Sequence, residues 1–138
     1  MSNSLKVIIL VGHPGCGKST WAKQYYDQLL HIDGDSLHTS ARVAKAVGAG
    51  LQQGRNVIVD ATNVTLERRR DIILQAQRYQ ALVYGVVFRV PLTTCMERSK
   101  KRESEGGVHI PSVAFWTSNS RYVEPTLEEG FTFIGSVE

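Results

Sequence analysis

The stretch GHPGCGKS at residues 12–19 decides the fold of this chain. Its spacing matches G-x-x-x-x-G-K-[ST], the pattern of a phosphate-binding loop, and the apolar run VIILV at residues 7–11 comes directly before it. A short β-branched run predicts a buried parallel strand, and the residues from Lys18 to about Leu30 are predicted to form a helix. Strand, loop and helix in this order favour a nucleoside triphosphate site over a chance glycine-rich loop.

The residue types of the loop predict how it holds a triphosphate. Its glycines allow backbone N–H groups to turn inward around the α- and β-phosphates. The Lys18 ammonium would reach the β- and γ-oxygens, and the Ser19 hydroxyl would hold Mg²⁺. The implied cofactors are therefore Mg²⁺ and ATP, the phosphate donor. The residues expected to bind the nucleotide are Gly12, His13, Pro14, Gly15, Cys16, Gly17, Lys18, Ser19 and Thr20.

Composition limits the class of protein. The 138 residues are 42% hydrophobic, which is enough for one core, so we expect a single domain over residues 1–138. No apolar run approaches membrane-spanning length and no leader pattern opens the chain, which predicts a soluble, cytoplasmic protein without membrane contact. The net charge of +3 allows a polyanionic partner without requiring one. Cys16 and Cys95 are expected to stay reduced, and no feature indicates an oligomeric state.

Apolar runs alternate with amphipathic stretches along the rest of the chain. We expect strands near residues 31–33, 57–60, 81–90 and 131–134, and helices near residues 37–53, 66–79, 92–103 and 111–122. This alternation predicts an α/β fold, a P-loop NTPase-type parallel sheet with helices on both faces and ligands at the carboxyl ends of the strands. Gly106 and Gly107 would give the last two helices the flexibility of a helical lid.

Three carboxylates follow predicted strands and should therefore lie near the phosphate loop. Asp60 ends an apolar strand, where it can orient Mg²⁺, and the alternative for it is a helix or turn cap. Asp35 follows Gly34, which predicts an unusual turn that presents the next side chain outward. That carboxylate can accept the proton of an attacking hydroxyl, or it can cap the next helix. Asp33 is expected to belong to the scaffold.

Two arginines on the predicted lid suit a phosphoryl group. Arg98 and Arg102 are four residues apart on one predicted helix, so their like charges lie on the same face and repel. An anion bound between them would offset that repulsion, and guanidinium groups suit the charge that develops on a transferred phosphoryl group. The alternative is an ordinary solvated basic face. The arginine run at residues 68–70 is expected to face solvent.

These segments resemble the phage-type polynucleotide 5′-hydroxyl kinases of the P-loop kinase superfamily. The resemblance covers most of the chain, as a kinase domain without further modules. It implies that Asp35 is the general base, that Arg102 is the essential lid arginine and that Arg98 matches an upstream lid position. The segments that carry it are GHPGCGKSTWA at 12–22, IDGDSL at 32–37, VDATNVTLERRR at 59–70 and VPLTTCMERSKKR at 90–102.

The resemblance implies a kinase that phosphorylates the 5′-OH end of RNA or DNA, but one position departs from the family. Three residues beyond the base, where the family typically has an arginine that contacts the 3′-phosphate side of the acceptor, this chain has His38. Arg42, one helical turn further on, could take its place. The residues expected to bind the acceptor are His38, Arg42, Asp60, Thr62 and Asn63.

Two other functions remain open on sequence alone. The first is a small-molecule kinase of the same superfamily, with a sugar acid, an antibiotic or a nucleotide sugar as the acceptor. The second is a nucleotide-gated interaction module that hydrolyses slowly. A base candidate together with a pair of lid arginines favours transfer over switching, and the chain has no Asn-Lys-x-Asp motif for reading guanine.

Overall fold

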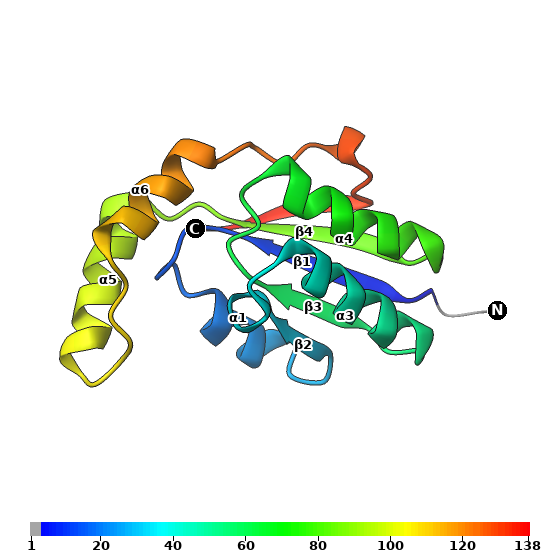
Figure 1. The fold of residues 1–138 in the computed structure, drawn as a ribbon, viewed down its shortest axis with the longest axis horizontal. Coiled ribbons are helices and arrows are strands. Elements are labelled where there is room, and N and C mark those ends of the chain that lie inside the picture. The colour runs from blue at the N-terminus through cyan, green and yellow to red at the C-terminus, as the bar shows by residue number, and fades with distance from the viewer. Residues whose placement is uncertain (1–3) are drawn as a thin grey trace.

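Within residues 4–138, which the computed structural model describes, five strands form one parallel sheet in the order β2-β3-β1-β4-β5 (Figure 1). The strands are β1 (Lys6–Val11), β2 (Leu30–Asp33), β3 (Val57–Asp60), β4 (Leu82–Phe88) and β5 (Phe133–Val137). The central strand β1 pairs with β3 and β4, so that Val7 lies opposite both Val57 and Val83. All the arrows in Figure 1 point toward the same end of the molecule, and the carboxyl ends of the strands therefore share one edge.

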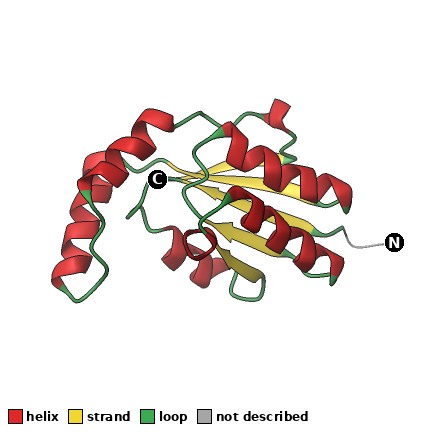
Figure 2. Ribbon diagram, in the orientation of Figure 1, coloured by secondary structure: helices red, strands yellow, loops and turns green. Residues whose placement is uncertain are grey.

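Helices cover both faces of this sheet (Figure 2). They are α1 (Lys18–Tyr25), α2 (Gly34–Leu37), α3 (Ser40–Gln52), α4 (Leu66–Arg78), α5 (Leu92–Ser104) and α6 (Ser112–Arg121), with a 3-10 turn η1 (Leu127–Glu129). Alternate residues of β1 face opposite ways: Val7 and Ile9 pack against α3 and α4, whereas Ile8 and Leu10 lie in the cluster that contains α1, α5 and α6. The predicted fold class is confirmed.

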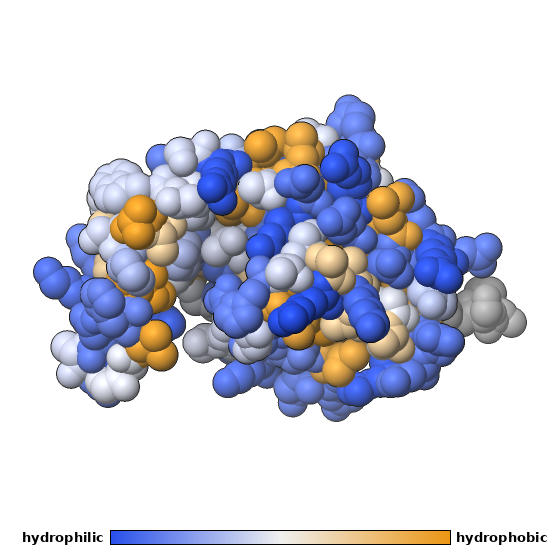
Figure 3. Space-filling model, viewed as in Figure 1, coloured by the Kyte–Doolittle hydropathy of each residue, from blue (hydrophilic) through white to orange (hydrophobic). Residues whose placement is uncertain are grey.

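Helices α5 and α6 lie beyond the carboxyl ends of the strands, in the place predicted for a lid (Figure 1). A recess separates them from the rest of the molecule in the space-filling view, where hydrophilic atoms predominate and apolar atoms form scattered patches (Figure 3). Among the described helices, none is long and apolar enough to cross a membrane.

Local hydrogen bonds explain where the elements begin and end. Thr65 caps α4, with its hydroxyl oxygen accepting from the Arg68 N–H at 3.2 Å. Helix α1 ends at Tyr25 rather than near Leu30, because the Leu30 N–H donates to the Asn56 carbonyl at 2.9 Å and joins that residue to the sheet. The short helix α2 was not predicted.

The last strand is also displaced from its prediction, to Phe133–Val137. Phe131 is buried under the sheet, where its ring fills the space that Gly85 leaves open, and a Cβ at Gly85 would lie 2.8 Å from that ring. The ladder with β4 therefore begins only at Phe133, which pairs with Tyr84.

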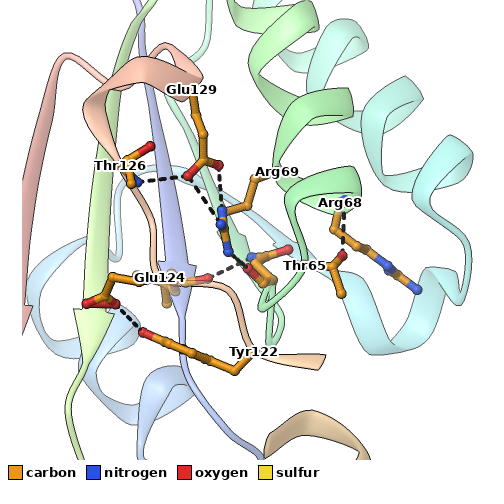
Figure 4. A network of polar contacts seen from close by, with 9 residues as sticks. Thr65, Arg68, Arg69, Tyr122, Glu124, Thr126 and Glu129 are labelled. Carbon is orange, nitrogen blue, oxygen red and sulfur yellow. Dashed lines mark hydrogen bonds and ion pairs between the residues drawn. The ribbon is translucent and has the colours of Figure 1, made fainter. Parts of the chain in front are cut away.

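The prediction that the arginine run faces solvent is wrong for Arg69, whose side chain is 0% exposed (Figure 4). Its Nε lies 2.7 Å from Oε1 of Glu129, a second guanidinium nitrogen lies 3.2 Å from Oε2, and the third donates to the Asn63 carbonyl at 3.0 Å. Glu129 also accepts from the Thr126 N–H at 2.8 Å. Because Glu129 lies sixty residues further along the chain, local patterning gave no sign of this pair.

Removal of the Arg69 side chain should strongly destabilise the protein. Arg69→Ala leaves the carboxylate of Glu129 and the carbonyl of Asn63 without their partner, so we expect the free energy of unfolding to fall by about 3 to 5 kcal/mol. Arg70→Ala on the exposed side of the same helix should change it by less than about 0.5 kcal/mol. Urea unfolding of both variants measures the difference, and equal midpoints would contradict the buried pair.

Candidate active site

The phosphate loop at residues 12–19 joins β1 to α1 and is held by its neighbours. Gly15 and Gly17 have φ values of 76° and 93°, which are left-handed conformations that favour glycine. A Cβ at Gly15 would lie 2.6 Å from the Cys95 carbonyl oxygen, so the loop contacts the backbone of α5 directly. The Gly12 N–H donates to the Thr62 carbonyl at 3.0 Å, which joins the loop to the segment after β3.

The ammonium of Lys18 lies inside this loop. It donates to the carbonyl oxygens of Gly12 and His13, at 3.0 and 2.8 Å, and lies 3.5 Å from the Cys16 sulfur. A hydrogen bond with the Cys95 thiol and the positive charge of Lys18 lower the pKa of the Cys16 thiol. The predicted phosphate-binding lysine is therefore buried and positioned by the loop itself.

Ser19 and Asp60 form a pair of oxygen ligands beside Lys18. The Ser19 hydroxyl donates to Oδ2 of Asp60 at 2.5 Å, and Nε2 of His31 lies 2.9 Å from the same oxygen. Hydroxyl and carboxylate oxygens suit Mg²⁺, which also takes water and phosphate oxygens. No cluster of three or more His, Cys, Asp or Glu residues that could hold a metal occurs in residues 4–138. The two oxygens of Ser19 and Asp60 fit an ion whose other ligands are water and the oxygens of a triphosphate.

A cavity of about 300 Å³, here called the phosphate-loop cavity, brings many of the predicted residues together. Arg102 of α5 lines it together with Lys18 and Asp60, so both the predicted lid and the loops at the strand ends contribute charge. The residues that line it are Pro14, Gly15, Gly17, Lys18, Ser19, Thr20, Asp35, Asp60, Thr62, Arg102, Ile110 and Ala114.

Asp35 reaches this cavity because another residue caps its helix. Asp33 is the N-cap of α2: its carboxylate accepts from the Asp35 N–H at 3.1 Å and from the Ser36 hydroxyl at 2.9 Å. This confirms Asp33 as scaffold and leaves the Asp35 carboxyl free for the cavity. Burial and the charge of Asp33 raise the pKa of Asp35, whereas Lys18 opposes the shift. A carboxylate with a raised pKa is the stronger base.

A second cavity of about 700 Å³, here called the side cavity, adjoins the first, and Pro14, Asp35, Thr62 and Ala114 line both. Helix α6 forms one wall of the side cavity, with Arg121 at the end of that helix. The other residues that line it are Gly34, His38, Ser40, Ala61, Val64, Thr65, Glu67, Arg68, Thr117 and Ser118.

A hydrogen bond fixes the α6 wall to the phosphate loop. Nδ1 of His13 lies 2.7 Å from the Ser118 hydroxyl, and the His13 ring packs against Tyr122 with 5.8 Å between ring centroids. Burial, and then the charge of Lys18, lower the pKa of His13, which keeps the ring neutral at pH 7. His13 therefore links the phosphate loop to the side cavity.

The structure places the other predicted residues in different surroundings. His38 lines the side cavity with a φ of 67°. Asn63 is buried and donates to the Leu10 carbonyl at 2.7 Å, which supports the loop after β3. Arg42 is exposed on α3 and lines neither cavity. Arg98 donates to the Cys16 carbonyl at 3.4 Å and does not line the cavity that Arg102 lines.

Arg98 lines a third cavity, of about 320 Å³, to which Cys16 and Gly17 of the phosphate loop also contribute. Thr20, Trp21 and Gln24 of α1 form one side of this cavity, and Val90 contributes from the segment after β4. The Trp21 ring meets Phe88 edge-on with 5.5 Å between centroids, so this tryptophan packs against the sheet as well as lining the cavity.

Sequence reasoning missed the residues that α6 contributes, above all Ser118 and Arg121. Neither belongs to a motif, and the position of α6 over the strand ends depends on contacts far along the chain. Arg68 was part of a run that the sequence did display, but the pattern could not indicate which member of the run faces the cavity.

Comparison with known proteins agrees with this architecture. The profile of the AAA_33 family, described as an AAA domain, matches residues 30–125. The bifunctional polynucleotide phosphatase/kinase of Schizosaccharomyces pombe is 30% identical over 99% of this chain and 34% of its own length. A protein of Acanthamoeba polyphaga mimivirus, named as an enzyme of the same kind, is 26% identical over 96% of this chain and 33% of its own length. The chain thus spans about a third of these relatives.

A solved structure of a gluconokinase from Sinorhizobium meliloti 1021 superposes with a TM-score of 0.69. It covers 99% of this chain and 83% of that one at 19% identity, a likeness that concerns the fold alone. The predicted resemblance to polynucleotide kinases and the predicted P-loop fold are confirmed by these comparisons.

A methyl group at Gly15 should disrupt the loop in two ways, through backbone strain and through a clash with the Cys95 carbonyl. Gly15→Ala introduces a left-handed alanine and places its Cβ against Cys95, whereas Gly54→Ala has the same φ of 76° with open space around it. We expect Gly54→Ala to lower the free energy of unfolding by about 1 kcal/mol, and Gly15→Ala to lower it further and weaken ATP binding at least tenfold. Thermal unfolding and calorimetric titration with ATP test this, and equal effects would contradict the close contact.

Proposed function

The chain belongs to the AAA_33 family, and on that premise we propose that residues 1–138 act as one kinase domain that transfers the γ-phosphate of ATP to the 5′-hydroxyl of an RNA or DNA end. The observation that carries this proposal is the position of Asp35. It lies where the phosphate-loop cavity meets the side cavity, so one carboxylate borders both a site for a triphosphate and a separate space for an acceptor.

The donor would bind along the phosphate loop. Lys18 neutralises the β- and γ-oxygens, and the nucleoside extends toward the cavity beside Trp21, where Arg98 lies. Ser19 and Asp60 would hold Mg²⁺, which would supply positive charge beside the phosphate oxygens. Arg102 would face the γ-phosphoryl group from the lid and stabilise the charge that develops during transfer.

The acceptor would bind in the side cavity with its 5′-hydroxyl beside Asp35. The hydroxyl oxygen attacks the γ-phosphorus, its proton passes to the carboxylate of Asp35, and the bond from the γ-phosphorus to the bridging oxygen breaks to release ADP. Thr62 lines both cavities and is placed to contact either the phosphate or the acceptor. The products are ADP and a 5′-phosphate end.

The relatives support a nucleic acid acceptor, because the two that we compared are named for polynucleotide phosphatase and kinase activity. We carry over only the kinase activity to this chain, since it spans about a third of the length of these relatives. Small-molecule kinases remain the alternative, because the gluconokinase has the same fold. A nucleotide-gated module is less favoured, because it needs no carboxylate at the meeting point of two cavities.

Transfer of labelled γ-phosphate from ATP to 5′-OH RNA and DNA oligonucleotides, with Mg²⁺ present, tests the proposal. Lys18→Ala should reduce labelling at least 100-fold because it removes the charge at the β- and γ-oxygens. Asp35→Asn should reduce it by about 100- to 10,000-fold because it removes the base. Turnover of ATP with gluconate, but without labelling of oligonucleotides, would favour the small-molecule kinase.

The pH dependence of the transfer rate should report Asp35. Its pKa is raised in the folded protein, and only the deprotonated carboxylate can accept the proton, so activity should fall as the pH drops through that raised value. The midpoint of the acid limb of kcat/KM should therefore lie above about 3.9, the ordinary pKa of aspartate. The residual activity of Asp35→Asn should lack this limb, and an unchanged profile in the variant would assign the limb to another group.

A further inference from the structure

We infer that His13 is a positioning residue, which holds helix α6 against the phosphate loop through Ser118 and so keeps the wall of the side cavity closed to water during phosphoryl transfer. This inference rests on the proposed function and explains how the acceptor hydroxyl, rather than water, reaches the γ-phosphorus. His13 itself lines neither the phosphate-loop cavity nor the side cavity. Its side chain therefore acts through Ser118 and not by touching a substrate.

The pattern of the phosphate loop leaves the residue type at position 13 open. In G-x-x-x-x-G-K-[ST] this position directly follows the first glycine, so the triphosphate needs only the main chain there. The main chain of His13 belongs to the donor site, because its carbonyl accepts from the Lys18 ammonium at 2.8 Å. The imidazole is bonded instead to α6, with 2.7 Å between Nδ1 and the Ser118 hydroxyl oxygen. One residue thus contacts the donor's lysine with its main chain and the acceptor's wall with its side chain.

Few polar contacts hold α6 in place. The helix lies beyond the carboxyl ends of the strands and packs chiefly against α5 (Figure 1). Among the hydrogen bonds of residues 4–138, the bond between Ser118 and His13 is the one that joins a side chain of α6 to another segment. Ser118 is buried, so water competes little for this bond. The distance of α6 from the phosphate loop therefore depends on this hydrogen bond.

A chain of contacts orients the His13 ring. The ring packs against Tyr122 with 5.8 Å between ring centroids, and the Tyr122 hydroxyl donates to Oε2 of Glu124 at 2.6 Å (Figure 4). The other carboxylate oxygen of Glu124 pairs with the Arg89 guanidinium at 2.6 Å. A side chain whose neighbours are themselves held keeps its own geometry more precisely. The imidazole therefore has a defined orientation from which to hold Ser118.

A shift of α6 would change the reaction as well as the shape of the cavity. Ala114 and Arg121, four residues before Ser118 and three after it, lie on the same face of the helix and line the side cavity. Movement of this face would admit water beside Asp35 and misplace the acceptor hydroxyl. Water that attacks the γ-phosphorus gives ADP and inorganic phosphate, so the phosphoryl group is lost to hydrolysis. A loose wall should thus lower transfer without lowering hydrolysis.

The ratio of transfer to hydrolysis measures this positioning. The labelling of a 5′-OH oligonucleotide and the release of inorganic phosphate from ATP are followed in the same reaction. Ser118→Ala and His13→Phe both remove the hydrogen bond, and His13→Phe keeps an aromatic ring beside Tyr122. We expect each variant to lower the ratio by about 10- to 100-fold. Loss of folded protein would lower both rates together and leave the ratio unchanged.

Two further variants sharpen this test. Ser120→Ala removes a hydroxyl from the same helix, but that hydroxyl donates to the Thr117 carbonyl within α6 at 3.1 Å. Its ratio should stay within about twofold of the wild-type value. His13→Asn places an amide atom near the position of Nδ1 without a ring, and should retain most of the ratio. A wild-type ratio in His13→Phe would overturn the inference. Equal losses in His13→Asn and His13→Phe would overturn it too, because the ring rather than the hydrogen bond would then hold α6.

Hydrogen exchange tests the same contact without any acceptor. The amides of α6 should exchange faster in Ser118→Ala and His13→Phe than in the wild type and in Ser120→Ala, because less free energy is then needed to open the helix. Equal exchange in all four proteins would overturn the inference, whatever the acceptor is. Failure of the wild type to label any oligonucleotide would instead overturn the proposed acceptor, and the ratio would then be measured with gluconate.

Discussion

The site depends on the hydrogen-bonded junction between the end of β1 and the loop that follows β3. The Gly12 N–H donates to the Thr62 carbonyl, the Asn63 amide donates to the Leu10 carbonyl, and the buried guanidinium of Arg69 donates to the Asn63 carbonyl. Leu10, Asn63 and Arg69 are buried, so water does not compete for these hydrogen bonds and their geometry is held. They fix Asp60 and Thr62 relative to the phosphate loop, and Glu129 extends the same network to the C-terminal segment.

The parts of this site that sequence could predict are those encoded locally. The phosphate loop, the strand that ends at Asp60 and the cap at Thr65 each follow from neighbouring residues, and the structure has all three. Asp33 also caps as expected of a scaffold residue, although the helix that it caps is too short to leave a periodic pattern. Preferences for a turn, a strand or a helix cap depend on a few neighbouring residues, so a single sequence is enough to predict them.

Contacts between distant segments could not be predicted in this way. The run at residues 68–70 was expected to face solvent, but Arg69 within it is fully buried because it pairs with the carboxylate of Glu129 in η1. Nothing in the sequence of the run indicates that partner. The expectation that Arg98 and Arg102 share one anion rests on helical spacing alone. In the structure Arg98 donates to the Cys16 carbonyl of the phosphate loop and lines the cavity beside Trp21, whereas Arg102 lines the phosphate-loop cavity. Tertiary placement decides the role of each charge.

The charges placed around Asp35 also make its pKa depend on which substrates are bound. Arg68 and Lys18 both lower the pKa of this carboxyl, against the effects of burial and of Asp33 and Asp60. A triphosphate at Lys18 would neutralise one of those positive charges, and an acceptor that fills the side cavity would displace water from around Asp35. Both changes raise the affinity of Asp35 for a proton. The carboxylate would therefore become a stronger base once both substrates are in place, which couples their binding to activation of the acceptor's hydroxyl.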